Sequence, residues 1–140
     1  MSRKAIKTIS NEELKYIPED MQEYKEDAPL MVDRPLIIYG RKLTNNQKWQ
    51  MKALMGKMNK YETYVEGTGE ALEYIWNNCA TRVCNVIAEV DGKVTEIEEV
   101  SGKDKDALWN TEGMELALYG AVAFFQSSSE LDEEEVKTSV

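Results

Sequence analysis

The segment VIAEVDGKVTEIE, residues 86–98, decides the fold class of this chain. β-Branched residues are frequent on both sides of Asp91-Gly92, and such residues are enriched in strands. The Asp-Gly pair readily takes the positive φ angles that a tight type I′ turn requires. The segment therefore predicts an antiparallel β-hairpin with strands from Val86 to Val90 and from Lys93 to Glu98.

Another strand is predicted upstream, in the segment RPLIIY at residues 34–39. Its isoleucines and its tyrosine favour extended backbone. Pro35 suits a strand start or a sheet edge, because proline has no backbone N–H to donate to a neighbouring strand. Gly40 is expected to end this strand.

Apolar residues recur at helical spacing in three other parts of the chain. Either Thr44 or Asn45 can cap the first of these helices, and the third is expected to break at Asn110-Thr111. The three tryptophans fall at helical positions and are expected to anchor the core. The helices are predicted over residues 44–59, 68–79 and 107–125, with their tryptophans at Trp49, Trp76 and Trp109.

The order of these elements predicts a single α+β domain that is mainly helical and carries a small antiparallel sheet. A length of 140 residues fits one domain. Residues 1–30 are polar and contain little to bury, so we expect a flexible N-terminal arm there. Residues 31–128 are expected to form the globular domain, with a charged connector at 101–106, and residues 129–140 to form an acidic tail.

The chain is strongly acidic, with 26 Asp and Glu against 17 Lys and Arg and a formal net charge of −9. Phosphate backbones repel such a chain, so broad nucleic-acid binding is not expected. Residues 1–10 lack the apolar run of a secretory signal. The longest apolar segment would span about 20 Å as a helix, whereas a bilayer core needs about 30 Å. We therefore expect a cytosolic protein that binds neither nucleic acid nor membrane.

Residues that commonly carry chemistry are scarce. The chain has no histidine, which is the commonest general base and metal ligand. Cys79 and Cys84 have no second pair to complete a zinc site, and on a helix they would project in different directions, so free thiols are expected. Gly67-Thr68-Gly69 lacks the rest of a phosphate-binding loop and fits a helix entry. The sequence predicts no catalytic residue, no metal and no cofactor, and therefore no enzyme.

The most apolar segment, Gly113 to Phe125, carries one charge and precedes acidic residues 130–135. This pattern fits a core helix followed by a solubilising tail, and it also fits an adhesive surface kept in solution by nearby charge. We hypothesise that one helical stripe packs internally, while the flank with Tyr119 and Phe124 meets a client or another copy of the chain. The alternative is that both sides are buried. The candidate partner-binding residues are Met114, Leu118, Tyr119, Val122, Phe124 and Phe125.

Three features give the chain a likeness to a known family. A strand leads into a capped helix at residues 33–44, the hairpin spans Val86 to Ile97, and a closing helix precedes SSELDEEEVKTS at residues 128–139. The chain resembles the tail assembly chaperones of long-tailed bacteriophages, which are encoded upstream of the tape measure protein. Their common ending has Asn where this chain has Thr138.

The resemblance implies a non-enzymatic role in the cytoplasm of a bacterial host. Members of the family are thought to coat the aggregation-prone tape measure protein and to recruit the major tail protein, which forms the tail tube, during tail assembly. The implied partners are thus these two proteins, and a homo-oligomer is also compatible. Two alternatives are an acidic phage-encoded inhibitor that mimics nucleic acid and a structural head–tail or tail component of the virion.

Overall fold

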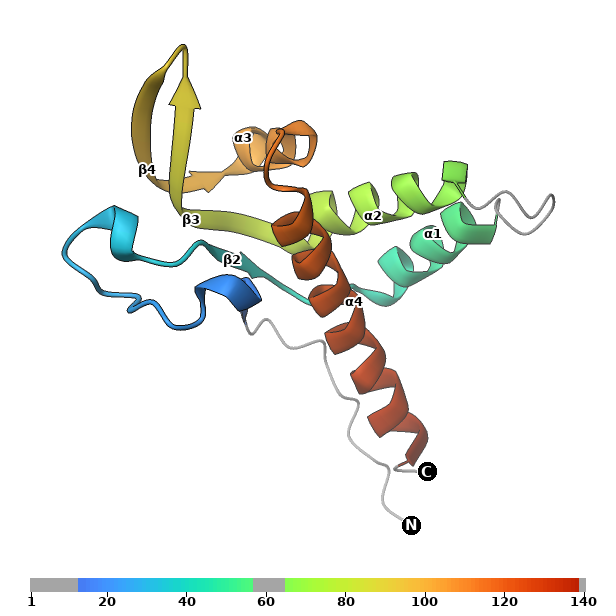
Figure 1. Cartoon of the computed structure of the whole chain (residues 1–140). Helices are drawn as coiled ribbons and strands as arrows, with labels where there is room; N and C mark the ends of the chain where they lie inside the picture. The colour runs from blue at the N-terminus through green and yellow to red at the C-terminus, as the bar shows by residue number, and fades with distance from the viewer. Residues whose placement is uncertain (1–12, 57–64, 139–140) are drawn as a thin grey trace.

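The computed structural model of the protein describes residues 13–56 and 65–138 (Figure 1). Within these residues the chain forms a single α+β domain with four helices and a four-stranded antiparallel sheet, as the sequence predicts. The strands follow one another in the order β1-β2-β3-β4. Their bounds are Leu14–Tyr16 (β1), Ile37–Gly40 (β2), Ala80–Val90 (β3) and Lys93–Ser101 (β4).

The predicted hairpin is confirmed. β3 and β4 pair from Arg82↔Ser101 to Val90↔Lys93, and the turn residues Asp91 and Gly92 have φ angles of 53° and 78°. Both angles are positive, as a type I′ turn requires. Figure 1 shows the outer part of the hairpin projecting from the rest of the molecule.

Part of the segment expected to be a flexible arm belongs to the sheet instead. β1 pairs with β2 in the register Leu14↔Gly40 to Tyr16↔Ile38. A three-residue edge strand has almost no local signal of its own, because partner backbone groups and packing supply its stability. The expectation for residues 1–30 is therefore wrong for β1, while residues 1–12 lie outside the described part of the chain.

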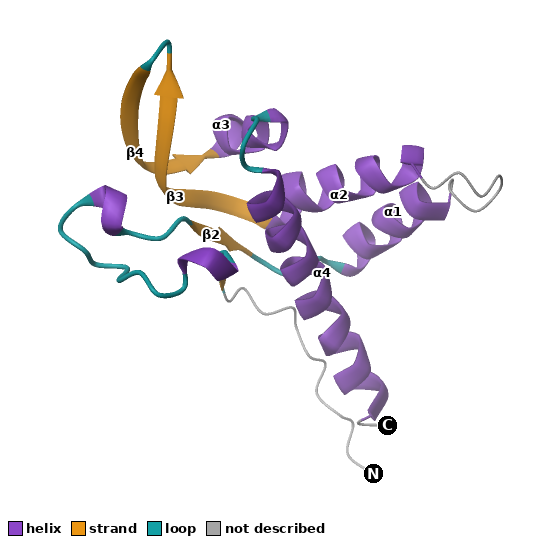
Figure 2. Ribbon diagram, viewed as in Figure 1, coloured by secondary structure: helices purple, strands orange, loops and turns teal. Residues whose placement is uncertain are grey.

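The helices lie beside the sheet, and α4 crosses it near β2 (Figure 2). The expected break at Asn110-Thr111 is confirmed, because a short 3-10 turn ends there before α4 begins. The expected connector at 101–106 is wrong: Ser101 ends β4, and Gly102, with φ 61°, opens α3. The helices are Asn45–Gly56 (α1), Val65–Cys79 (α2), Gly102–Ala107 (α3) and Glu115–Thr138 (α4), with 3-10 turns at Glu19–Met21 (η1), Met31–Asp33 (η2) and Leu108–Asn110 (η3).

The start of α1 is fixed by a reciprocal cap. The backbone N–H of Gln47 donates to Thr44 Oγ1 at 3.2 Å, and the backbone N–H of Thr44 donates to Gln47 Oε1 at 2.9 Å. This is a capping box, and it identifies Thr44 as the cap. Trp49 on the same helix is 72% exposed, so the expectation that it anchors the core is wrong. The buried residue is Met51, which lies about 200° around the helix from Trp49.

The core lies between the sheet and the helices α2 and α4. Its largest fully buried side chains include Trp76 and Phe125. Gly40 has no side chain for a packing reason, because a Cβ there would lie 2.5 Å from the Phe125 ring and 2.7 Å from the Cys79 carbonyl oxygen. Strand β2 and helix α4 can therefore approach closely only with glycine at this position.

The boundary expected between the globular domain and an acidic tail is also wrong. The Oγ of Ser129 is buried, accepts a hydrogen bond from the Leu43 backbone N–H at 2.9 Å and donates one to the Phe125 carbonyl at 2.8 Å. Ser129 thus belongs to the core, and α4 continues without a break to Thr138. An uninterrupted helix satisfies backbone groups that a separate tail would leave to water.

Candidate functional site

Helix α4 presents two very different faces. Leu118, Val122 and Phe125 are fully buried against the sheet and α2, so the internal stripe of the sequence hypothesis is present. These three candidate partner-binding residues cannot contact another molecule in this conformation. Met114 and Phe124 are partly buried, and the Phe124 ring lies 5.7 Å from the Tyr16 ring. Of the six candidates, Tyr119 is the one that remains half exposed.

The outer face of α4 consists of Leu116, Tyr119, Ala123 and Ser127, all of them exposed. Leu116 is 89% exposed and Tyr119 is 50% exposed. No charged residue occurs between positions 116 and 129, although the solvent face of a surface helix normally carries charged and polar side chains. The sequence hypothesis missed Leu116, but its spacing of i, i+3 and i+7 with Tyr119 and Ala123 could have identified it.

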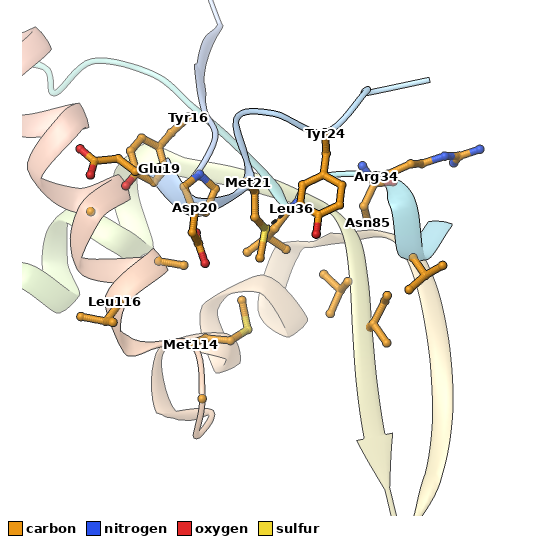
Figure 3. A pocket seen from close by; sticks show the side chains of 17 residues that line it. Tyr16, Glu19, Asp20, Met21, Tyr24, Arg34, Leu36, Asn85, Met114 and Leu116 are labelled. Carbon is orange, nitrogen blue, oxygen red and sulfur yellow. Dashed lines mark hydrogen bonds between the residues drawn. The ribbon is translucent and has the colours of Figure 1, made fainter. Parts of the chain in front are cut away.

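A groove of about 870 Å³ lies beside this outer face (Figure 3). Three parts of the chain form its walls: the segment from Tyr16 to Leu36, the middle of β3, and the first turns of α4. Sequence reasoning could not have found it, because most of the first wall, from Tyr16 to Tyr24, belongs to the segment that was expected to be a flexible arm. Apolar side chains in its lining include Met21, Val32, Leu36, Ile87, Met114 and Leu116.

One hydrogen bond fastens the first wall to the sheet, and two contacts hold the wall together internally. The Asn85 side-chain amide donates to the Pro35 carbonyl at 2.9 Å, and Asn85 itself has a φ of 63°. The Leu36 backbone N–H lies 3.3 Å from Met21 Sδ, and the Arg34 Nε donates to the Ala28 carbonyl at 2.6 Å. Asparagine tolerates the left-handed conformation better than most residues, which allows β3 to bend at this wall.

Tyr16 joins the first wall to α4. A Cβ at Gly120 would lie 2.1 Å from the Tyr16 hydroxyl oxygen, so the tyrosine reaches the helix only because position 120 has no side chain. Burial raises the pKa of Tyr16, and the neighbouring carboxylates of Glu19 and Asp20 raise it further. These two carboxylates place negative charge beside Tyr16 at the rim of the groove.

The rim of the groove is acidic. In Figure 3 the Asp20 carboxylate points into the groove, whereas the Arg34 side chain points away from it. Neither Glu19 nor Asp20 forms an ion pair with any residue in the ranges 13–56 and 65–138. By contrast, Arg82 on the sheet contacts both Glu13, at 2.7 Å, and Glu99, at 3.0 Å.

Tyr119 is supported from one side only. Its ring meets the Trp109 ring edge-on, with centroids 5.5 Å apart, and Trp109 in turn stacks on the buried Trp76 at 6.2 Å. Trp76 and Trp109 thus serve the core, as expected from the sequence. The exposed edge of Tyr119 is held in place by this aromatic stack, and aromatic side chains with a fixed orientation are common anchors at protein interfaces.

The described residues offer little chemistry at other positions. Both cysteines are free thiols, as predicted, and burial raises the pKa of the Cys79 thiol to about 12. In the described ranges, no group of three or more His, Cys, Asp or Glu side chains is placed to hold a metal ion. No helix in these ranges combines the length and apolar character needed to span a membrane.

Comparison of the chain with protein-family models, curated proteins and solved structures finds no match.

Proposed function

We propose that this protein is a phage tail assembly chaperone that shields an apolar segment of another polypeptide and performs no chemistry. The observation that carries the proposal is the outer face of α4, which is exposed, uncharged over residues 116–129 and continuous with an apolar groove. Contiguous exposed apolar surface of this kind is typical of protein interaction sites.

The resemblance in the sequence gives the proposal its specific content. The client is then the tape measure protein, a long chain prone to aggregation, and the major tail protein is recruited while the client is covered. The site of action is the cytoplasm of the bacterial host. A net charge of −9 supports the same role, because like charges on successive chaperones keep the coated client from associating.

The division of α4 into two faces suits such a role physically. Leu118, Val122 and Phe125 hold the helix to the fold, so the outer face can bind and release a client without disturbing the core. Leu116 and Tyr119 supply apolar contact area. Burying such area stabilises a complex by about 25 cal/mol for each Å² removed from water. Acidic residues at the rim remain solvated and limit unwanted self-association.

Co-expression with the protein encoded immediately downstream tests the proposal. We expect the wild-type chain to keep that protein in the soluble fraction, and we expect Leu116→Lys or Tyr119→Lys to abolish the effect. Leu116 is 89% exposed, so its replacement leaves the fold intact, which circular dichroism checks. Val94→Lys is the control, because Val94 is also apolar and is 62% exposed but lies on the hairpin.

The proposal fails if the Leu116→Lys and Tyr119→Lys chains keep the client in solution as well as wild type does. It also fails if purified mature virions contain this chain as a stoichiometric component. Phe124 is a poorer test position than the sequence suggested, because its partly buried ring contacts Tyr16 and Phe125. A charged residue there would disturb the fold as well as any interface.

A further inference from the structure

The outer face of α4 has the geometry of a helix-packing surface. Its exposed side chains recur at i, i+3, i+7 and i+11 from Leu116 to Ser127, and such ridges fit the grooves of a second helix. Eleven residues correspond to roughly 17 Å of helix, which is about three turns of a partner. Ala123 and Ser127 on this face are small and exposed, so the axis of a partner helix can approach closely there.

The groove lies along one flank of the outer face of α4, and it can receive side chains of such a partner there. Its walls are α4 on one side and the segment from Tyr16 to Leu36 on the other, with Val86 and Ile87 of β3 between them. η2 contacts β3 next to the groove. The partner is therefore expected to contact mainly side chains of β3 there, and not the unpaired backbone groups of a strand edge. A helix lying on α4 would therefore direct one row of apolar side chains into the groove.

The charges around this position are mainly negative, although Arg34 also lines the groove. Glu19 and Asp20 stand on the rim, Glu112 and Glu115 lie exposed at the start of α4, and the Arg34 side chain points away. Within the described ranges, neither Glu19 nor Asp20 has a cationic partner. A second copy of this acidic chain would be repelled here, whereas a basic side chain would be attracted.

From these features we infer that the occupant is an amphipathic α-helix of the client, with an apolar stripe on α4 and a row of Lys or Arg facing Glu19 and Asp20. This inference rests on the proposed function and specifies the chemistry of the client segment. The apolar stripe supplies most of the affinity, and the basic row supplies orientation and the rate of association.

Two designed helical peptides of about 18 residues test the inference against the full-length chain. They share one Leu/Ala stripe, and they differ in carrying Lys or Glu along the edge beside it. Exposed ion pairs contribute modestly, so we expect the Lys-edged peptide to bind about two- to fivefold more tightly for each pair formed. The difference should shrink as salt is raised, because screening weakens exposed charge pairs.

Variants of the protein identify the residues responsible. Asp20→Lys should remove or reverse the preference for the Lys-edged peptide, while Leu116→Lys should weaken the binding of both peptides. Glu73→Lys makes the same change of charge at an exposed position on α2, away from the groove, and should leave the preference intact. Thermal unfolding of each variant verifies that the fold is retained.

Equal affinity for the two peptides, or a preference that Asp20→Lys does not alter, overturns the inference. If client rescue in cells still depends on Leu116, the proposed function survives that result and the client segment has another chemistry. If the Leu116→Lys chain keeps the client in solution as well as wild type does, the proposed function itself is refuted, regardless of the peptide affinities. Failure of both peptides to bind also refutes a helical occupant.

Discussion

The contact between Tyr16 and Gly120 gives a sharp test of how the groove is built. In Gly120→Ala the new Cβ would lie 2.1 Å from the Tyr16 hydroxyl oxygen and 2.9 Å from Cζ. Comfortable contacts between heavy atoms are about 3.5 Å, so the hydroxyl must move by more than 1 Å. Tyr16 resists this movement because β1 pairs with β2 and the ring packs beside Phe124.

Two opposing terms set the size of the effect. Overpacking costs about 1–3 kcal/mol, whereas replacing glycine by alanine inside a helix stabilises by about 1 kcal/mol. We therefore expect Gly120→Ala to lower the free energy of unfolding by about 0–2 kcal/mol. In a Tyr16→Phe background the clash at 2.1 Å is gone and the nearest atom is the ring carbon at 2.9 Å. There the ring must move by only about 0.6 Å, compared with about 1.4 Å for the hydroxyl, so the same substitution should destabilise the fold less or not at all.

Urea denaturation followed by tryptophan fluorescence measures the four corners of this double-mutant cycle. We expect a coupling free energy of about 1–2 kcal/mol between the two positions. Gly69→Ala in α2 is the control, because no atom lies within 4 Å of a Cβ there, and it should stabilise the fold. An equal effect of Gly120→Ala in both backgrounds would mean that Tyr16 does not rest on α4.

Two further predictions concern the core. The buried Lys105 ammonium donates to the carbonyls of Trp76, at 3.0 Å, and Asn77, at 3.4 Å, so Lys105→Met should cost about 2–3 kcal/mol of unfolding free energy in urea titrations. The exposed Lys103→Met should change the free energy of unfolding by less than about 0.5 kcal/mol. Similar losses for both variants would mean that the hydrogen bonds from Lys105 to the end of α2 do not stabilise the fold. Cys79 has an ordinary pKa of 9.0 when unfolded and one of about 12 when folded, so above pH 9 the unfolded state holds fewer protons and stability falls with rising pH. Cys79 should contribute up to about 1.4 kcal/mol per pH unit to this fall, so the fall should be shallower by about that amount in Cys79→Ala. Identical slopes for both chains would refute it.

The hairpin and the capped start of α1 were predictable because their rules are local. Asp91-Gly92 takes positive φ angles whatever surrounds it, and Thr44 finds its capping partner three residues away. The buried stripe of α4 was also predictable, since Leu118, Val122 and Phe125 repeat at helical spacing.

Positions that depend on distant partners were not predictable. β1 is stable because Leu14 and Tyr16 pair across the sheet with residues more than 20 positions away. Trp49 looked like a core residue because the sequence of α1 has apolar residues on more than one side, and only packing against α2 decides which side is covered.

By itself, the sequence determined an acidic α+β chain whose hairpin, helices and apolar closing segment follow from turn chemistry, capping and periodicity. Only the tertiary structure decided which side of α4 meets water and which segments come together as a groove. Helical periodicity ranks the faces of a helix by polarity, but α4 has no charged face between residues 116 and 129. The choice between its sides therefore rested on long-range packing against the sheet and α2.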